Sequence, residues 1–352
     1  MADNETHTID AGALTSFCTD VFTAAGVPFD EASVIATSLV DANLIGLDSH
    51  GVSRVTDYLA RLDQNLVNPK TDLTLVSETA GTALLDANNG WGQVASQKAV
   101  EIAIDKARAV GTAWVGVTNS NHNGTAAYWT RKIAEAGMIG ISGTNSSPVM
   151  APFGGKDASL GTNPISIAVP TKDGPSVVLD MATSAQARGK IIVAAKNGEA
   201  IPLGWALDAG GQPTTDAKEA LDGTLLPMAG PKGSGLAIMV DILAGVLNGA
   251  SFGADMPRMY GDSAPQLLGH FFIALDISAM TPLSAFLDRM SSREDQTRNG
   301  TPAAGYERVL MPGDLEAGKR TDNLRAGLLL SPSIFDELVA TARSRGVEKQ
   351  LA

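Results

Sequence analysis

Cysteine is almost absent from this chain of 352 residues, which contains only Cys18. A single thiol cannot form an internal disulfide, so we expect a reducing, cytoplasmic compartment. Long apolar runs are also missing, which argues against a transmembrane helix, and the acidic first ten residues, MADNETHTID, argue against a secretory signal. With 44% hydrophobic and 18% charged residues, the composition predicts a globular protein that buries a large core in two domains.

Positive charge is scarce relative to negative charge. The chain has 26 lysines and arginines against 38 aspartates and glutamates, for a net charge of −12. This balance argues against nucleic acids and anionic membranes as partners. It also repels an acidic substrate at long range, so any anion site must contain its own cations.

Several common functional signatures are absent. No G-x-G-x-x-G motif follows a predicted strand, so the standard Rossmann fingerprint is missing, and no stretch has the Walker spacing. There is no H-E-x-x-H, no cysteine pair and no cluster of histidines with carboxylates, so we expect no metal site. The G-x-S-x-G elbow of the α/β hydrolases is missing as well.

The stretch 143–190 has the pattern of a binding site at the rim of a sheet. Two β-like runs, 165–169 and 177–179, are bracketed by small polar residues at 161–164 and 180–184. Such strand ends leave backbone N–H groups and hydroxyls free to hold nucleotides and other anions. The alternative is an ordinary series of turns.

Periodicity predicts the remaining elements along the chain. Helices are expected over 10–26, 30–47, 94–110, 125–136, 236–247 and 334–345, and strands over 73–76, 82–86, 113–117 and 270–276. The glycine-rich loop 227–235 carries Lys232 just before a long apolar helix, which is a suitable anion cradle.

Three of the side chains that follow Leu47 predict an acid–base and anion site. If a helix begins near Ser49, His50, Arg54 and Tyr58 share one face at i, i+4 and i+8. A histidine, a guanidinium and a phenol together suit proton transfer and carboxylate binding. A solvated helix face with a surface histidine is the alternative.

The other three histidines have different expected roles. His122 lies in a polar loop just past the end of a buried strand, where α/β enzymes place working groups, although it could instead cap the following helix. His270 opens a strand and is expected to be structural. His7 is expected in a disordered tail.

Six short motifs, taken together and in order, resemble the malate/L-lactate/ureidoglycolate dehydrogenase family across nearly the whole chain. They are SHGVSR at 49–54, NSNH at 119–122, GTNP at 161–164, DMATS at 180–184, GPKG at 230–233 and MPG at 311–313. Relatives include L-sulfolactate dehydrogenase, diketogulonate reductase and piperideine-2-carboxylate reductases.

The resemblance implies an α/β fold that is not the Rossmann fold, the L-sulfolactate-dehydrogenase-like fold. In this fold a nicotinamide cofactor binds a mixed sheet, and both chain ends form a helical domain within a homodimer. The implied division is 1–118 with 285–352 as the helical substrate and dimerisation domain, and 119–284 as the cofactor domain.

The implied function is NAD(P)-dependent hydride transfer between nicotinamide and C2 of a small 2-hydroxy or 2-oxo carboxylic acid. An NADPH-dependent reductase of a cyclic imine carboxylate or of a keto sugar acid is the alternative, and a non-catalytic binding protein is a third. The implied catalytic residues are His50, which we favour as the proton carrier, and His122. The implied substrate residues are Ser49, Arg54 and Tyr58.

The positions that match cofactor contacts are Ser146, Thr162, Asp180, Met181, Ala182, Arg188, Lys232, Pro312, Gly313 and Asp314. Two of them depart from the family pattern: Asp314 stands where many relatives have Glu, and Arg188 stands where some NAD-using relatives have an aromatic residue. An arginine at 188 could meet the 2′-phosphate of NADP, or it could only cap the following helix or face solvent. The choice between NAD and NADP therefore stays open here.

Overall fold

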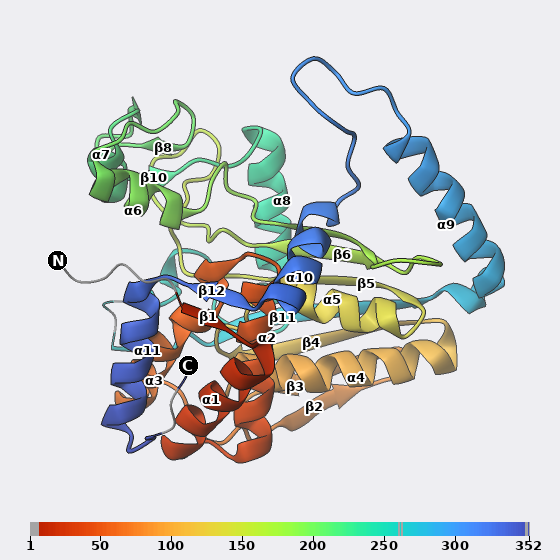
Figure 1. Ribbon diagram of the computed structural model, residues 1–352, viewed down its shortest axis with the longest axis horizontal. Helices are drawn as coiled ribbons and strands as arrows, with labels where there is room; N and C mark the ends of the chain where they lie inside the picture. The colour runs from red at the N-terminus through yellow and green to blue at the C-terminus, as the bar shows by residue number, and fades with distance from the viewer. Residues whose placement is uncertain (1–6, 260, 262, 349–350, 352) are drawn as a thin grey trace.

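The computed structural model describes residues 7–259, 261, 263–348 and 351. Its centre is a mixed sheet of seven strands (Figure 1). Their order across the sheet is β2 (Thr74–Glu78), β3 (Thr82–Asp86), β4 (Thr112–Ser120), β11 (Leu268–Asp276), β5 (Met138–Thr144), β6 (Ile165–Val169) and β7 (Val177–Met181). Only β3 and β4 run parallel, and the other neighbours are antiparallel. The expected mixed sheet is confirmed.

The central strand β11 is covered on both faces. Successive side chains of a strand point to opposite faces, so Phe272 and Phe271 reach different layers. Phe272 packs with residues of α4 (Gly92–Val110) and α5 (Ala126–Glu135). Phe271 packs with Val240 and Ala244, which belong to α8 (Pro231–Asp241) and to the π-helical turn after it (Ile242–Val246). The first five residues of the strand, 268–272, are all buried.

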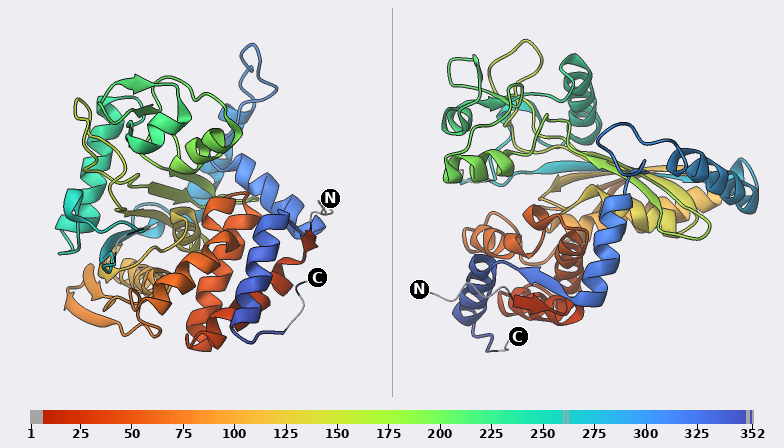
Figure 2. Two further views of the ribbon diagram at one scale, coloured as in Figure 1. Left: turned by 90° about the vertical axis from the view of Figure 1, so that its left-hand side faces the viewer. Right: turned by 45° about the horizontal axis from the view of Figure 1, so that its top comes forward.

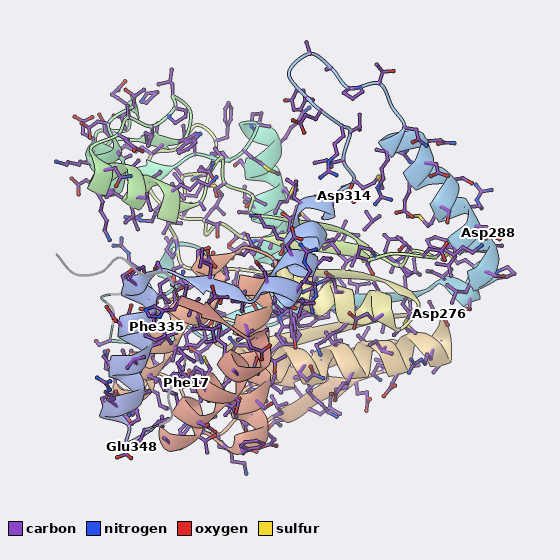
Figure 3. All side chains as sticks on the ribbon, in the orientation of Figure 1. Phe17, Asp276, Asp288, Asp314, Phe335 and Glu348 are labelled. Carbon is purple, nitrogen blue, oxygen red and sulfur yellow. The ribbon has the colours of Figure 1, made fainter. Side chains whose placement is uncertain are left out.

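The two ends of the chain form one helical layer. It contains α1 (Ala11–Ala24), α2 (Phe29–Leu44), α3 (Val55–Asp63) and α11 (Pro332–Ser344), and its core includes Phe17 (Figure 3). Strands β1 (His7–Ile9) and β12 (Leu328–Leu330) pair beside it. The expectation of a disordered tail at His7 is wrong, because His7 lies in β1 and stacks on Phe335 with ring centroids 3.7 Å apart.

A smaller lobe lies on the opposite side of the sheet from this helical layer (Figures 1 and 2). It contains α6 (Arg188–Asn197), α7 (Ala217–Asp222) and the short strands β8 (Ala206–Leu207), β9 (Pro213–Thr214) and β10 (Thr224–Leu225). The lobe has its own core, which includes Met150, Ile191 and Leu225. The chain then returns through α8 and β11 to α9 (Leu283–Arg298) and α10 (Asp314–Ala326).

Two predicted helix starts are wrong. The helix expected from Ser49 begins at Val55, after two 3₁₀ turns (Asp48–His50 and Val52–Arg54). The helix expected from residue 236 begins at Pro231, because proline suits the first helical position, so Lys232 lies in the first turn of α8. Among the residues that the structure describes, no helix has both the length and the apolar character needed to cross a membrane.

Candidate active site

The segment around His50 is shaped by Asn43 at the end of α2. The Asn43 side chain accepts a hydrogen bond from the Val52 backbone N–H at 2.8 Å and donates one to Asp48 at 2.7 Å. A Cβ atom on Gly51 would lie 2.2 Å from Asn43 Oδ1, so only glycine fits between the two 3₁₀ turns. This interruption explains why no continuous helix begins at Ser49.

Ser49, His50 and Arg54 are linked in spite of that interruption. Ser49 Oγ lies 3.0 Å from His50 Nδ1, and Arg54 Nε donates to the Ser49 carbonyl at 2.7 Å. Arg54 also forms an ion pair with Asp57 at 3.2 Å. Burial, together with the positive charge of Arg54, lowers the pKa of His50 from 6.5 to about 4.

His122 follows β4 and meets this group from another part of the chain. The rings of His50 and His122 have centroids 5.6 Å apart, and the Tyr58 hydroxyl lies 2.6 Å from His122 Nδ1. Burial, followed by the nearby His50, Arg54 and His270, lowers the pKa of His122 well below 6.5. All five residues that the sequence predicted for catalysis and substrate binding therefore form one connected cluster, with both rings neutral at neutral pH.

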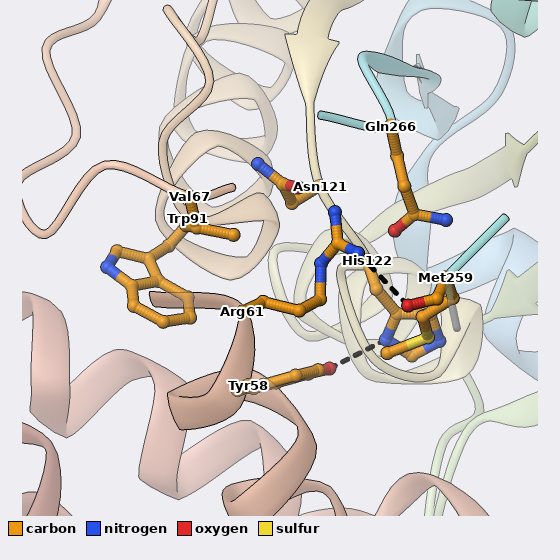
Figure 4. A pocket seen from close by; sticks show the side chains of 8 residues that line it. All are labelled: Tyr58, Arg61, Val67, Trp91, Asn121, His122, Met259 and Gln266. Carbon is orange, nitrogen blue, oxygen red and sulfur yellow. Dashed lines mark hydrogen bonds between the residues drawn. The ribbon is translucent and has the colours of Figure 1, made fainter. Parts of the chain in front are cut away.

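A small pocket next to His122 contains residues that the sequence did not single out (Figure 4). Arg61 lines it and donates to the Met259 carbonyl at 3.0 Å. Asn121 Oδ1 and Gln266 Oε1 are buried there without a hydrogen-bond partner in the described part of the chain. The volume, about 10 Å³, is that of a single water molecule.

His270 has the expected structural role. Its side chain is fully buried, with Nδ1 2.7 Å from the Thr144 hydroxyl and Nε2 2.9 Å from the Ser120 hydroxyl. Burial lowers its pKa to about 3. The residue joins β11 to both neighbouring strands and is committed to those contacts.

A larger cavity of about 270 Å³ lies between β7, α5 and the start of α10. Its lining combines apolar and charged residues, among them Ile45, Leu47, Val178, Pro312, Gly313, Arg131, Asp180, Glu316 and Arg320. Arg131 and Arg320 each bond one oxygen of the Asp41 carboxylate. Burial raises the pKa of Asp180 from 3.8 to about 6, although the Ala127 backbone N–H donates to its carboxylate at 3.0 Å.

Three predicted cofactor residues, Asp180, Pro312 and Gly313, line this cavity. The Val178 backbone N–H donates to the Pro312 carbonyl at 3.0 Å, so the chain before α10 runs along the edge of β7. Gly313 has φ +91°, and a Cβ there would lie 3.1 Å from the Val178 backbone. Glycine is required at this close approach.

Two further predicted residues lie together at neighbouring strand ends. Ser146 Oγ is 3.4 Å from Thr162 Oγ1, and a Cβ on Gly161 would lie 2.2 Å from the Ser146 carbonyl oxygen. The Thr183 backbone N–H donates to the Thr162 carbonyl at 2.8 Å, which joins this pair to the turn that contains Met181 and Ala182. The ends of β5, β6 and β7 thus form one continuous rim.

The other three predicted cofactor residues have different surroundings. Arg188 donates to the Leu221 carbonyl at 2.9 Å within the small lobe, and Lys232 is exposed on α8. Asp314 bonds Arg298 at 2.8 Å and accepts from the Met311 backbone N–H at 2.8 Å. None of the three is among the residues that line the cavity in the described structure.

Comparison with known proteins gives a consistent result across the chain. A family model for malate/L-lactate dehydrogenase matches residues 9–339. The chain is 39% identical to a malate dehydrogenase of Pyrococcus abyssi, over 95% of this chain and 94% of that protein. It is 36% identical to a ureidoglycolate dehydrogenase (NAD(+)) of Escherichia coli, over 90% of this chain and 91% of that protein. The solved sulfolactate dehydrogenase of Methanocaldococcus jannaschii superposes with a TM-score of 0.91, at 36% identity, over 97% and 98% of the two chains.

Proposed function

The chain belongs to the malate/L-lactate dehydrogenase family, and we propose that His50, His122, Tyr58 and Arg54 form its active site. The enzyme is an NAD(P)-dependent dehydrogenase that transfers a hydride between nicotinamide and C2 of a small 2-hydroxy or 2-oxo carboxylic acid. The observation that supports this site best is the 2.6 Å contact of Tyr58 with His122 beside the His50 ring. It brings three side chains that can transfer a proton together, and the positive charge of Arg54 acts on both histidine rings.

The residues around the larger cavity fit part of a nicotinamide cofactor. Ile45, Leu47 and Val178 provide the apolar walls that an adenine ring needs, and Asp180 and Glu316 provide acceptors for ribose hydroxyls. The cavity and the histidines lie close along the chain, because Ala127, which bonds Asp180, follows His122 by five residues. We propose that Ser146, Thr162 and the turn 180–182 contact the rest of the cofactor.

We further propose that NAD is preferred to NADP. Asp180 and Glu316 bring two carboxylates to the cavity, whereas Arg131 and Arg320 are both paired with Asp41. Carboxylates accept hydrogen bonds from a 2′-hydroxyl and repel a 2′-phosphate. The cofactor contacts of Lys232 and Asp314 stay as predictions, and so does the contact of Arg188 with a 2′-phosphate. In the structure the Arg188 guanidinium is hydrogen-bonded to the Leu221 carbonyl.

The cofactor supplies or accepts the hydride at its nicotinamide ring when it is bound. The protein must hold the substrate carboxylate and transfer the hydroxyl proton. Arg54, oriented by Ser49 and Asp57, would bind the carboxylate. The neutral histidines beside it would carry the proton, since low pKa values keep both rings uncharged near pH 7.

A cytoplasmic homodimer is our proposal for the assembled enzyme. One face of α8 and of the π turn leaves Ile238, Ile242 and Val246 between 40% and 49% exposed at a spacing of four residues. Such a stripe is unusual on a monomer and supports burial against a second copy. We also propose the two-domain division at residues 118 and 284, in which both chain ends supply the helical domain. The exposed stripe lies in the cofactor domain, so the second copy would contact that domain as well as the helical domain.

The test of function is the absorbance of reduced nicotinamide with a substrate panel and both cofactors. The panel contains pyruvate, oxaloacetate, ureidoglycolate, sulfolactate and piperideine-2-carboxylate. We expect turnover with at least one 2-hydroxy or 2-oxo acid, and faster turnover with NADH than with NADPH. Turnover of the cyclic imine alone would favour the reductase alternative, and no turnover of any compound would contradict the proposal.

A further inference from the structure

Two hydrogen bonds reach Nδ1 of His122. The Gly124 backbone N–H lies 3.3 Å from it, and a backbone N–H can only donate, so Nδ1 must present its lone pair. The Tyr58 hydroxyl, 2.6 Å from the same atom, therefore donates as well (Figure 4). The phenol oxygen still accepts from Gln93 Nε2 at 3.1 Å. In the neutral ring the proton consequently sits on Nε2.

This tautomer limits what His122 can do alone. A neutral ring with its proton on Nε2 can donate to a carbonyl oxygen, but that nitrogen has no lone pair to accept the proton of an alcohol. Releasing the Nε2 proton without replacement would leave an imidazolate anion. A second proton must therefore reach Nδ1 as the first one leaves Nε2, and Tyr58 is the side chain that points a proton at Nδ1.

We propose that Tyr58 gives and takes back this proton through His122, so that the pair, rather than either ring alone, is the acid and base of the reaction. The proposal rests on the function proposed above. In reduction, the substrate carbonyl carbon receives the hydride while its oxygen takes the proton from His122 Nε2. Nδ1 takes the proton of Tyr58 at the same time, so the imidazole stays neutral and Tyr58 becomes a phenolate. Once the product has left, Nε2 takes a proton from solvent while Nδ1 gives its proton back to the Tyr58 phenolate, which restores the starting state. Oxidation reverses every transfer.

The charges around the pair suit a transient phenolate. Arg54 and Arg61 stand one turn before and after Tyr58, with Arg54 paired to Asp57, and Arg61 lines the pocket that Tyr58 and His122 share. Gln93 Nε2 donates to the phenol oxygen and would stabilise its negative charge. His50 and His270, the other titratable groups that act on His122, stay uncharged near pH 7.

Tyr58→Phe tests the relay, because it keeps the ring and removes only the hydroxyl. We expect kcat for reduction at pH 7.5 to fall by about 100-fold, the usual size of an acid–base contribution. In the variant, His122 can act as an acid only as an imidazolium, whose pKa lies below 6.5. Its kcat should therefore rise as the pH falls from 7 to 5, whereas the wild-type kcat changes little there. NADH affinity, measured by fluorescence titration, should be unchanged.

Tyr128→Phe is the matched control, since it removes a buried hydroxyl from α5 and should leave the pH profile as it is. A Tyr58→Phe enzyme whose kcat falls by the same factor at every pH would show a merely structural role and overturn the relay.

The second readout needs no turnover. Nitrogen-15 NMR of His122 in the full-length enzyme with NADH should show a protonated Nε2 and a bare Nδ1. A proton on Nδ1 would overturn the proposal even in an active enzyme, and failure of the function proposal would appear instead in the substrate panel.

Discussion

The segment 122–127 joins the histidine cluster, which contains His122, to the larger cavity, which Ala127 lines, and the two regions are built in opposite ways. The cluster holds neutral rings, and hydrogen bonds from Tyr58 and Gly124 decide where the proton sits. The cavity holds charges, with Asp180 and Glu316 beside two arginines that Asp41 pairs. If the two regions have the proposed roles, proton transfer depends here on orientation, whereas cofactor binding depends on charge. Each change below should therefore affect one region and leave the other intact.

The largest effect is expected at His122 rather than at His50, which the sequence favoured as the proton carrier, because the proposed relay with Tyr58 involves His122. His122→Asn removes the group that we propose gives the proton to the substrate, so kcat should fall by about 1,000-fold while NADH affinity stays the same. Stopped-flow and fluorescence titration measure the two quantities. His50→Asn is the comparison, and we expect a smaller loss there because Ser49, rather than a relay group, bonds His50. A larger loss in His50→Asn would assign the main proton transfer to His50 instead.

The second effect concerns Arg54, whose positive charge acts on both histidines. Arg54→Ala should raise KM for a carboxylate substrate by roughly 100-fold, because removing one partner of a charged, hydrogen-bonded pair costs about 2–5 kcal/mol. The KM for NADH should not change. Lysine at this position should restore only part of the affinity, since it lacks the planar fork. Steady-state kinetics with both the carboxylate substrate and NADH provide the measurement. A normal substrate KM in Arg54→Ala would contradict the carboxylate-binding role.

A moderate effect of pH is expected on NADH affinity at the cavity. Because the pKa of Asp180 is raised to about 6, its carboxylate is ionised above that pH and gains a proton below it. If the ionised form accepts a ribose hydroxyl, NADH affinity should weaken several-fold as the pH falls from 7.5 to 5. Asp180→Asn should remove that dependence in fluorescence titrations. A pH-dependent affinity that persists in Asp180→Asn would assign the effect to another group.

The smallest effect is expected at Arg188. Its guanidinium already donates to the Leu221 carbonyl in the small lobe, so Arg188→Ala should change the KM values of NADH and NADPH little. Parallel kinetics with the two cofactors provide the measurement. A selective loss of NADPH affinity would show that Arg188 meets the 2′-phosphate after all, and it would reverse the expected preference for NAD.

Much of the architecture follows from the sequence pattern. Strands 82–86 and 165–169 have the predicted bounds, and α1, α2, α4, α5 and α11 lie within a few residues of theirs, because apolar periodicity reports which face is buried. The pattern misplaces helix starts where tertiary contacts decide them. At Ser49 the turns depend on Asn43, and at His7 the strand depends on residues more than 300 positions away.

The sequence indicated only part of the active site, because tertiary contacts also decide which residues meet there. Helical spacing predicted His50, Arg54 and Tyr58 on one continuous helix, and that helix is interrupted. The three still belong to one cluster, because Arg54 bonds the Ser49 carbonyl and both His50 and Tyr58 lie beside His122. Gln93 and Gln266 have no local signal, since each enters the site from its own segment. Arg61 lies one turn after Tyr58 on α3, so helical spacing could have indicated it. Asp41, Arg131 and Arg320 likewise form their ion pairs across 90 and 279 positions of the chain.

The amino-acid sequence by itself determined the family, the sheet-forming runs and the residue types that can move a proton or bind a carboxylate, because those depend on local pattern and side-chain chemistry. Only the tertiary structure decided which nitrogen of His122 carries the proton and which carboxylates face the cavity. The position of a proton depends on which donors stand within about 3 Å of each nitrogen. For His122, one donor is the backbone two residues away and the other is a phenol 64 residues distant.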